Sequence, residues 1–231
     1  MVTMFSVDIV LSDVESNYML TNKFKETDMV KSTPWFIKTA LFLSSFGCIA
    51  SNAYCNGTIT GTIETDLAKY KGDTVVYLEG VNEQVTPQHK SIDQKSLTFI
   101  PKVTTKPVGS TVDFTNNDKV YHNVNSTSES KKISLDTYDP GVPKPITFNK
   151  PGVVQLLCKV HPEMSGWVVV TENQYAAVTE HDGKFTIPNV PDGTYQIATW
   201  NEKLKLKGKT TVTVAEGKTV PVVIKLSDTT S

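Results

Sequence analysis

Residues 151–170, PGVVQLLCKVHPEMSGWVVV, place a thiol, an imidazole and a thioether between two apolar runs. The runs on either side are rich in β-branched side chains, so they predict two strands joined by a tight loop. The loop carries Cys158, His161 and Met164. Thiolate and thioether are soft ligands and imidazole binds several transition metals, so the stretch predicts a metal site at one end of a β-sheet.

A second imidazole would complete this donor set, and we expect it from another strand. His122, in a predicted strand from Val120 to Val124, is well placed to supply it. A His₂Cys set with a weak axial Met is the donor set of a blue-copper electron-transfer site. Cys158 alone would more often be a buried small hydrophobe, but the combination favours copper. Tyr121 and Trp167 are predicted to pack beside the site, and a path for the electron through either one is the alternative.

The composition argues against one large class of partners. None of the basic residues is arginine, and the formal net charge of the 231-residue chain is −1. Phosphate and base recognition favours the planar guanidinium group of arginine, so we expect no nucleic-acid partner. A chain of this length can form one large β domain or two smaller ones.

Residues 29–53 have the order of a secretory signal peptide, with a basic start, an apolar run and small residues before a cut after Ala53. The apolar run, Thr39 to Ala50, is too short for a stable membrane anchor. We therefore predict a periplasmic or secreted protein with no stable membrane span after cleavage. Residues 1–28 do not fit this plan, and our hypothesis is that translation starts at Met29.

The three cysteines have different expected fates. Cys48 lies inside the predicted signal peptide and would be removed with it, whereas Cys55 would be the second residue of the mature chain. A disulfide between Cys55 and Cys158 is the simpler alternative to metal binding in an oxidising compartment. Metal is favoured for Cys158 because a ragged N-terminus is a poor place for a structural bridge.

From Gly57 onward the sequence predicts strands and turns without a sustained helical period. Residues 96–100 alternate, which predicts Leu97 and Phe99 on one face of a strand. The lysine-rich residues 202–209 are predicted to be a loop. Short strands separated by glycine, proline and asparagine predict an all-β sandwich or barrel, preceded only by the helix of the signal peptide.

The last third of the chain contains the string DGKFTIPNVPDGTY at residues 182–195. This string resembles the carboxypeptidase regulatory-like family, whose members are small transthyretin-like β-sandwiches. The resemblance implies opening strands like those predicted near Ile59 and Val76, far before the closing strands. Two strands cannot stand alone in water, so we predict a split sandwich of residues 57–84 and 173–228. Residues 85–172 would then be an inserted domain, and two domains in tandem are the alternative.

The inserted region resembles the cupredoxins, and most closely the plastocyanin and amicyanin type with a short ligand loop. The resemblance is carried by VDFTNND at 112–118, HNV at 122–124, and the string from PGVVQLLCKVHPEM into SGWVVV. It implies a Greek-key β-sandwich that binds one type 1 copper ion. His122, Cys158 and His161 would be the strong ligands and Met164 the axial one. Asn123 matches a position that braces the ligand loop.

These patterns predict an electron carrier that cycles between Cu(I) and Cu(II), with a redox protein docking near His161 beside Pro162 and Val142. We do not expect an enzyme, because only His89 and His181 remain for a further copper site and both are predicted to lie on the surface. Two alternatives stay open. One is a protein that stores or delivers copper, and the other is a metal-free interaction protein on a cupredoxin-like fold.

Overall fold

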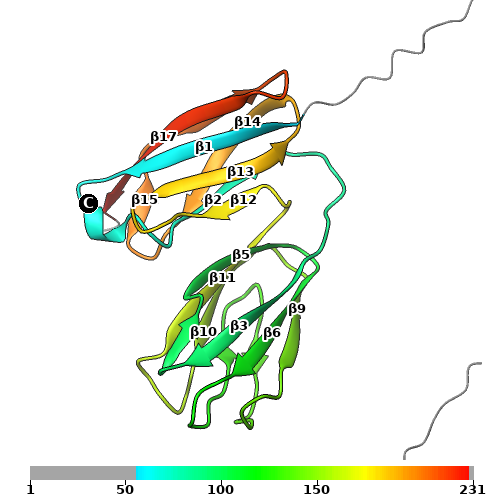
Figure 1. Cartoon of the computed structure of the whole chain (residues 1–231), viewed down its shortest axis with the longest axis vertical. Helices are drawn as coiled ribbons and strands as arrows, with labels where there is room; N and C mark the ends of the chain where they lie inside the picture. Colours follow the sequence, from blue (N-terminus) through cyan, green and yellow to red (C-terminus); the bar gives the residue numbers. More distant parts are fainter. Residues whose placement is uncertain (1–55, 229–231) are drawn as a thin grey trace, which may run out of the picture. The chain divides into compact units, whose positions relative to one another are not determined.

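The computed structural model describes residues 56–228, and the regular secondary structure of that part of the chain is almost entirely β-strand (Figure 1). Its one helical element is the short 3₁₀ helix η1, Ala68–Tyr70. The predicted start segment and signal peptide, residues 1–53, lie outside the described residues, as does Cys55. None of the helices in the described part is long and apolar enough to cross a membrane. The all-β prediction is confirmed for the described part of the chain.

Residues 89–171 form two sheets that enclose one hydrophobic core. The first sheet has the order β4-β3-β6-β9, and its strands are Thr98–Ile100, His89–Lys95, Ser110–Asn116 and Lys144–Phe148. The second sheet has the order β5-β11-β10-β7-β8, and its strands are Val103–Pro107, Ser165–Thr171, Gly152–Leu157, Asn125–Ser126 and Ile133–Ser134. β3 runs parallel to β6, because the chain passes through β5 of the second sheet between them, and β5 runs parallel to β11.

The alternation of side chains along these strands builds the core and places the thiol. In β6 every second residue is buried, so Val112 and Phe114 point into the sandwich. In β10 Val154 and Leu156 do the same, and Cys158 continues their face just beyond the strand. The thiol therefore lies at one end of an apolar core, as the sequence predicts.

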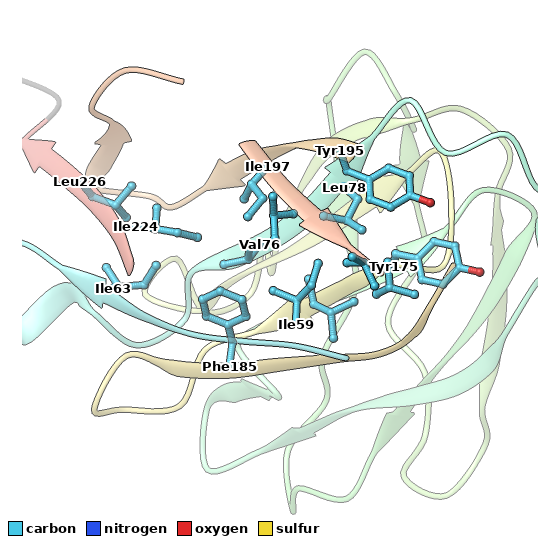
Figure 2. Packing of buried hydrophobic residues seen from close by; sticks show 14 of the residues in the cluster. Ile59, Ile63, Val76, Leu78, Tyr175, Phe185, Tyr195, Ile197, Ile224 and Leu226 are labelled. Atoms are coloured by element: carbon cyan, nitrogen blue, oxygen red, sulfur yellow. The ribbon is translucent and has the colours of Figure 1, made fainter. Parts of the chain in front are cut away.

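The remaining strands form a second pair of sheets. One has the order β13-β1-β17-β15, with strands Lys184–Val190, Gly57–Glu64, Thr219–Asp228 and Leu204–Leu206. The other has the order β12-β2-β14-β16, with strands Ala176–Val178, Val75–Glu79, Gly193–Trp200 and Thr210–Val214. Figure 2 shows how Ile59 from β1, Val76 from β2 and Ile197 from β14 point into a shared interior.

Pairing in this second sandwich joins segments that are far apart in the sequence. β1 pairs antiparallel with β13 and parallel with β17, and β2 pairs antiparallel with β12 and β14. Two opening strands are thus completed by strands of the last third. This pairing supports the proposal that residues 57–84 and 173–228 form one split domain and that residues 85–172 form the inserted domain.

Three local predictions are wrong. His122 is not in a strand from Val120 to Val124 but forms an isolated bridge with Tyr138. Leu97 has a φ of 58° in the tight turn between β3 and β4, and that turn directs its side chain outward while Phe99 is buried. The predicted lysine-rich loop contains β15, whose lysine side chain lies on an edge strand, where lysine is common.

Candidate metal centre

The ligand loop, residues 158–164, is closed by hydrogen bonds between its own backbone groups. The antiparallel pair β10 and β11 ends with Leu157 opposite Ser165. Beyond it the Cys158 N–H donates to the Met164 carbonyl at 3.4 Å, and the Met164 N–H donates to the His161 carbonyl at 3.0 Å. The loop is therefore held in one conformation at the end of the hairpin.

His122 reaches the same end of the sandwich from a different segment. Its carbonyl accepts a hydrogen bond from the Tyr138 N–H at 3.3 Å, and its side chain is fully buried. The next residue, Asn123, joins this segment to the ligand loop, because its Oδ1 accepts from the Lys159 N–H at 2.8 Å. The same oxygen accepts from Asn125 Nδ2 at 2.8 Å. Through its hydrogen bond to the Lys159 N–H, Asn123 would brace the ligand loop.

Three ligand atoms meet at this point. The Nδ1 atoms of His122 and His161 are 3.0 Å apart, and the Sγ of Cys158 is 3.9 Å from each of them. The two imidazole rings meet edge to face, with centroids 4.8 Å apart. The structure thus brings together the three residues predicted as strong ligands, and in the described part of the chain it is the one cluster of histidine, cysteine and acidic side chains of this kind.

The triangle of donor atoms has the size that a metal ion requires. The point equidistant from the three atoms lies about 2.1 Å from each of them, close to the ~2.0–2.3 Å of imidazole and thiolate bonds to a first-row ion such as zinc. Within residues 56–228 Cys158 is a free, buried thiol, and the alternative partner Cys55 lies outside the described residues. The residues present therefore fit a transition-metal ion, and the donor types favour copper.

Met164 shares the buried core with Cys158 and lies on the same loop. Its backbone helps to close that loop, as described above. The cluster seen in the structure consists of His122, Cys158 and His161. The thioether of Met164 as a fourth, axial ligand remains a prediction.

A carboxylate that the sequence analysis missed lies against the buried imidazole. Asp118 Oδ2 is 3.1 Å from His122 Nε2 and accepts a hydrogen bond from the Leu97 N–H at 3.0 Å. The Leu97 N–H, the His122 ring and the Lys119 N–H together lower the pKa of Asp118 to about 2. The only available signal was an aspartate four residues before the histidine, at the end of an Asn-Asn-Asp turn.

Several solved structures are similar to part of the chain. A purple cupredoxin from Nitrosopumilus maritimus is 30% identical over 36% of this chain and 99% of its own, with a TM-score of 0.31. A copper-containing nitrite reductase from Thermus scotoductus is 27% identical over 42% of this chain, with a TM-score of 0.36. Amicyanin from Paracoccus versutus is 22% identical over 40% of this chain and 86% of its own, with a TM-score of 0.33.

This chain spans only 26% of the nitrite reductase. The fold is identified by the two sheets that share one core and by the ligand loop at their end. Residues 89–171 form a cupredoxin-like β-sandwich. Curated proteins give no match to the chain.

One family model matches residues 152–222 and is described as polysaccharide lyase family 4, domain II. The match begins in the cupredoxin-like sandwich, at β10, and ends in β17 of the second one. The matching model is not specifically the carboxypeptidase regulatory-like one, so that resemblance of the last third stays a prediction. The turn string that carried this resemblance is short, and such turns occur in many small β-sandwiches.

Exposed apolar side chains flank the ligand segments of the cupredoxin-like sandwich. Val120 and Tyr121 precede His122, and Val160 lies on the ligand loop. Tyr121 is 61% exposed, so the prediction that it packs beside the site is wrong. It lies outside any strand, in the segment between β6 and β7. His89 and His181 are exposed, as predicted.

Proposed function

We propose that the chain is a type 1 copper protein that carries single electrons between redox partners. The observation that carries this proposal is the convergence of His122 Nδ1, Cys158 Sγ and His161 Nδ1 on one point at the end of an apolar core. Copper bound there would supply a one-electron couple between Cu(I) and Cu(II). Met164 completes the proposed ligand set as the axial donor.

The residues around the donors favour fast electron transfer because they fix the donor positions before metal binds. The ligand loop is held by its own backbone hydrogen bonds and by Asn123. The His122 ring is fixed by the contact between its Nε2 and Asp118 Oδ2. Donors that are fixed in this way move little between the two oxidation states, so little energy is spent on reorganisation.

The half-buried ring of His161 is the proposed exit for the electron, because the His122 and Cys158 side chains are buried. Near it in sequence, Val160 on the ligand loop is exposed, as is Val142 after the Asp-Pro-Gly turn. We propose that a redox protein docks beside His161 and contacts these exposed side chains. Transient electron-transfer complexes are small, and such contacts suit them.

We further propose that the protein acts outside the cytoplasm, as the signal-like residues 29–53 indicate, and that it is not an enzyme. His89 pairs with Asp113 at 2.8 Å, and His181 lies in a hairpin turn, so neither supports a second copper site in the described residues. The second sandwich would act as a stabilising or docking module.

The half-buried position of His161 also suits a protein that exchanges copper for storage or delivery, and redox cycling separates the two functions. The protein is loaded with one equivalent of Cu(II), then alternately reduced and oxidised, and retained copper is measured after gel filtration. An electron carrier keeps its copper through repeated cycles in wild type and in His181→Ala, a surface control, but loses it in His161→Ala. Release of copper from wild type on each reduction would favour delivery and refute the carrier.

A further inference from the structure

The carboxylate of Asp118 is fixed in place by backbone groups on both sides. Its Oδ2 accepts from the Leu97 N–H at 3.0 Å, and its Oδ1 accepts from the Lys119 N–H at 2.9 Å. The Asp118 N–H donates to Asn116 Oδ1 at 3.0 Å. Only 18% of the Asp118 side chain is exposed. The carboxylate therefore faces the His122 ring in a set orientation and is not a freely moving surface charge.

This contact determines which nitrogen of His122 can bind a metal. Because Asp118 Oδ2 is 3.1 Å from Nε2, the ring proton belongs on Nε2, and Nδ1 keeps its lone pair. That lone pair faces Cys158 Sγ and His161 Nδ1. Without the carboxylate, Nε2 would lose this acceptor, and only His161 Nδ1 and Cys158 Sγ would bias the ring between its two neutral forms.

Charge gives the contact a second consequence. A carboxylate that accepts the second N–H of a ligating imidazole raises the basicity of that ligand and tunes the metal. Burial strengthens this effect, because His122 is fully buried and water screens the charge of Asp118 poorly there. Negative charge behind the ring stabilises the more highly charged ion, Cu(II), relative to Cu(I).

We propose that Asp118 is a positioning residue that holds His122 in the Nδ1-donor form and lowers the reduction potential of the copper. This inference rests on the proposed function, because it concerns the same site. Removing the charge is expected to lower Cu(II) affinity about tenfold relative to Cu(I), the lower end of the 10–100-fold that such outer partners contribute to metal affinity. A tenfold shift in this ratio corresponds to about 59 mV for a one-electron couple.

The chain offers a matched control. Asp113 Oδ2 lies 2.8 Å from His89 Nε2, so it makes the same kind of pair in the same sandwich, but His89 is exposed and is not in the donor cluster. Asp118→Asn and Asp113→Asn each remove one charge and keep the size of the side chain. Asp118→Ala removes the acceptor as well, and far-UV circular dichroism checks that each variant is folded.

Two measurements test the proposal. Spectroelectrochemical titration of the copper-loaded full chain should give a potential about 59 mV higher in Asp118→Asn than in wild type, with Asp113→Asn unchanged. In the metal-free full chain, ¹⁵N NMR of the histidine rings should show the Nε2–H form of His122 in wild type and a mixture of forms in Asp118→Ala.

The outcomes separate this inference from the proposed function. An unchanged potential and an unchanged His122 ring form in the Asp118 variants would overturn the inference, whatever the wild-type copper spectrum. Equal shifts in Asp118→Asn and Asp113→Asn would also overturn it, because the effect would then be one of overall charge. If wild type binds no redox-active copper, the proposed function fails, and the NMR measurement still tests the ring-form part.

Discussion

Replacing Asn123 with alanine should loosen the ligand loop at a single point. One oxygen of this side chain holds two groups, the Lys159 N–H on the ligand loop and the Asn125 amide, both at 2.8 Å. The side chain of Asn123 is buried, with 8% exposed. The substitution therefore leaves two donors without their partner in a place that water reaches poorly.

The size of the effect follows from these contacts. A buried donor left unsatisfied costs about 1–3 kcal/mol, and the Lys159 N–H is only partly buried. A total loss of about 2–3 kcal/mol in the free energy of unfolding is expected. In a protein of this size each kcal/mol shifts Tm by about 2–4 °C, so Tm should fall by about 4–12 °C.

Thermal unfolding of the metal-free protein, followed by circular dichroism, measures this loss. Asn117→Ala is the matched control, because the Asn117 amide donates to Asp93 Oδ1 at 3.0 Å on the exposed surface. The control should lose less than about 0.5 kcal/mol. Asn123→Asp keeps the accepting oxygen and should recover part of the loss. Equal losses in Asn123→Ala and Asn117→Ala would refute the bracing role.

Two further predictions concern residues away from the donors. Lys106→Met should stabilise the protein by about 1–2 kcal/mol at pH 7, because burial lowers the pKa of Lys106 to about 8 and charged Lys106 is 4% exposed. Between pH 8 and 10.5 the lysine is neutral in the folded state but still charged in the unfolded state, so wild-type stability rises with pH. The stability advantage of Lys106→Met, measured by urea unfolding, should therefore shrink over that pH range. A constant advantage would contradict the burial argument. Gly61→Ala should destabilise by about 1–3 kcal/mol, since the new methyl group would clash with the Phe185 ring and lie 2.7 Å from the Val222 carbonyl. Urea unfolding checks this, and an unchanged midpoint would mean that the two strands move apart freely.

The donors could be predicted from sequence because the loop that carries them is local. Cys158 and His161 follow one strand and precede the next, so their meeting depends on a single hairpin. His122 could be predicted as a ligand because it is a histidine, although the strand predicted around it does not form. Its position depends on one bridge to Tyr138, a contact between distant residues that no periodicity reveals.

Features that depend on turn geometry or on pairing between distant strands could not be predicted. Asp118 contacts His122 only because an Asn-Asn-Asp turn folds back and the Leu97 N–H anchors the carboxylate. β3 is mostly polar along its length and pairs parallel with β6, so neither its composition nor its neighbours in sequence identify it as a strand. β15 is short and belongs to an edge, where pairing with β17 outweighs its lysine-rich context.

The visible absorption of the full chain titrated with Cu(II) tests the central claim most directly. If His122, Cys158 and His161 hold one copper ion, wild type should develop an intense thiolate-to-copper band that saturates at one equivalent. Cys158→Ser should lack the band while remaining folded. A wild-type protein that stays colourless, or a band that persists in Cys158→Ser, would contradict the account.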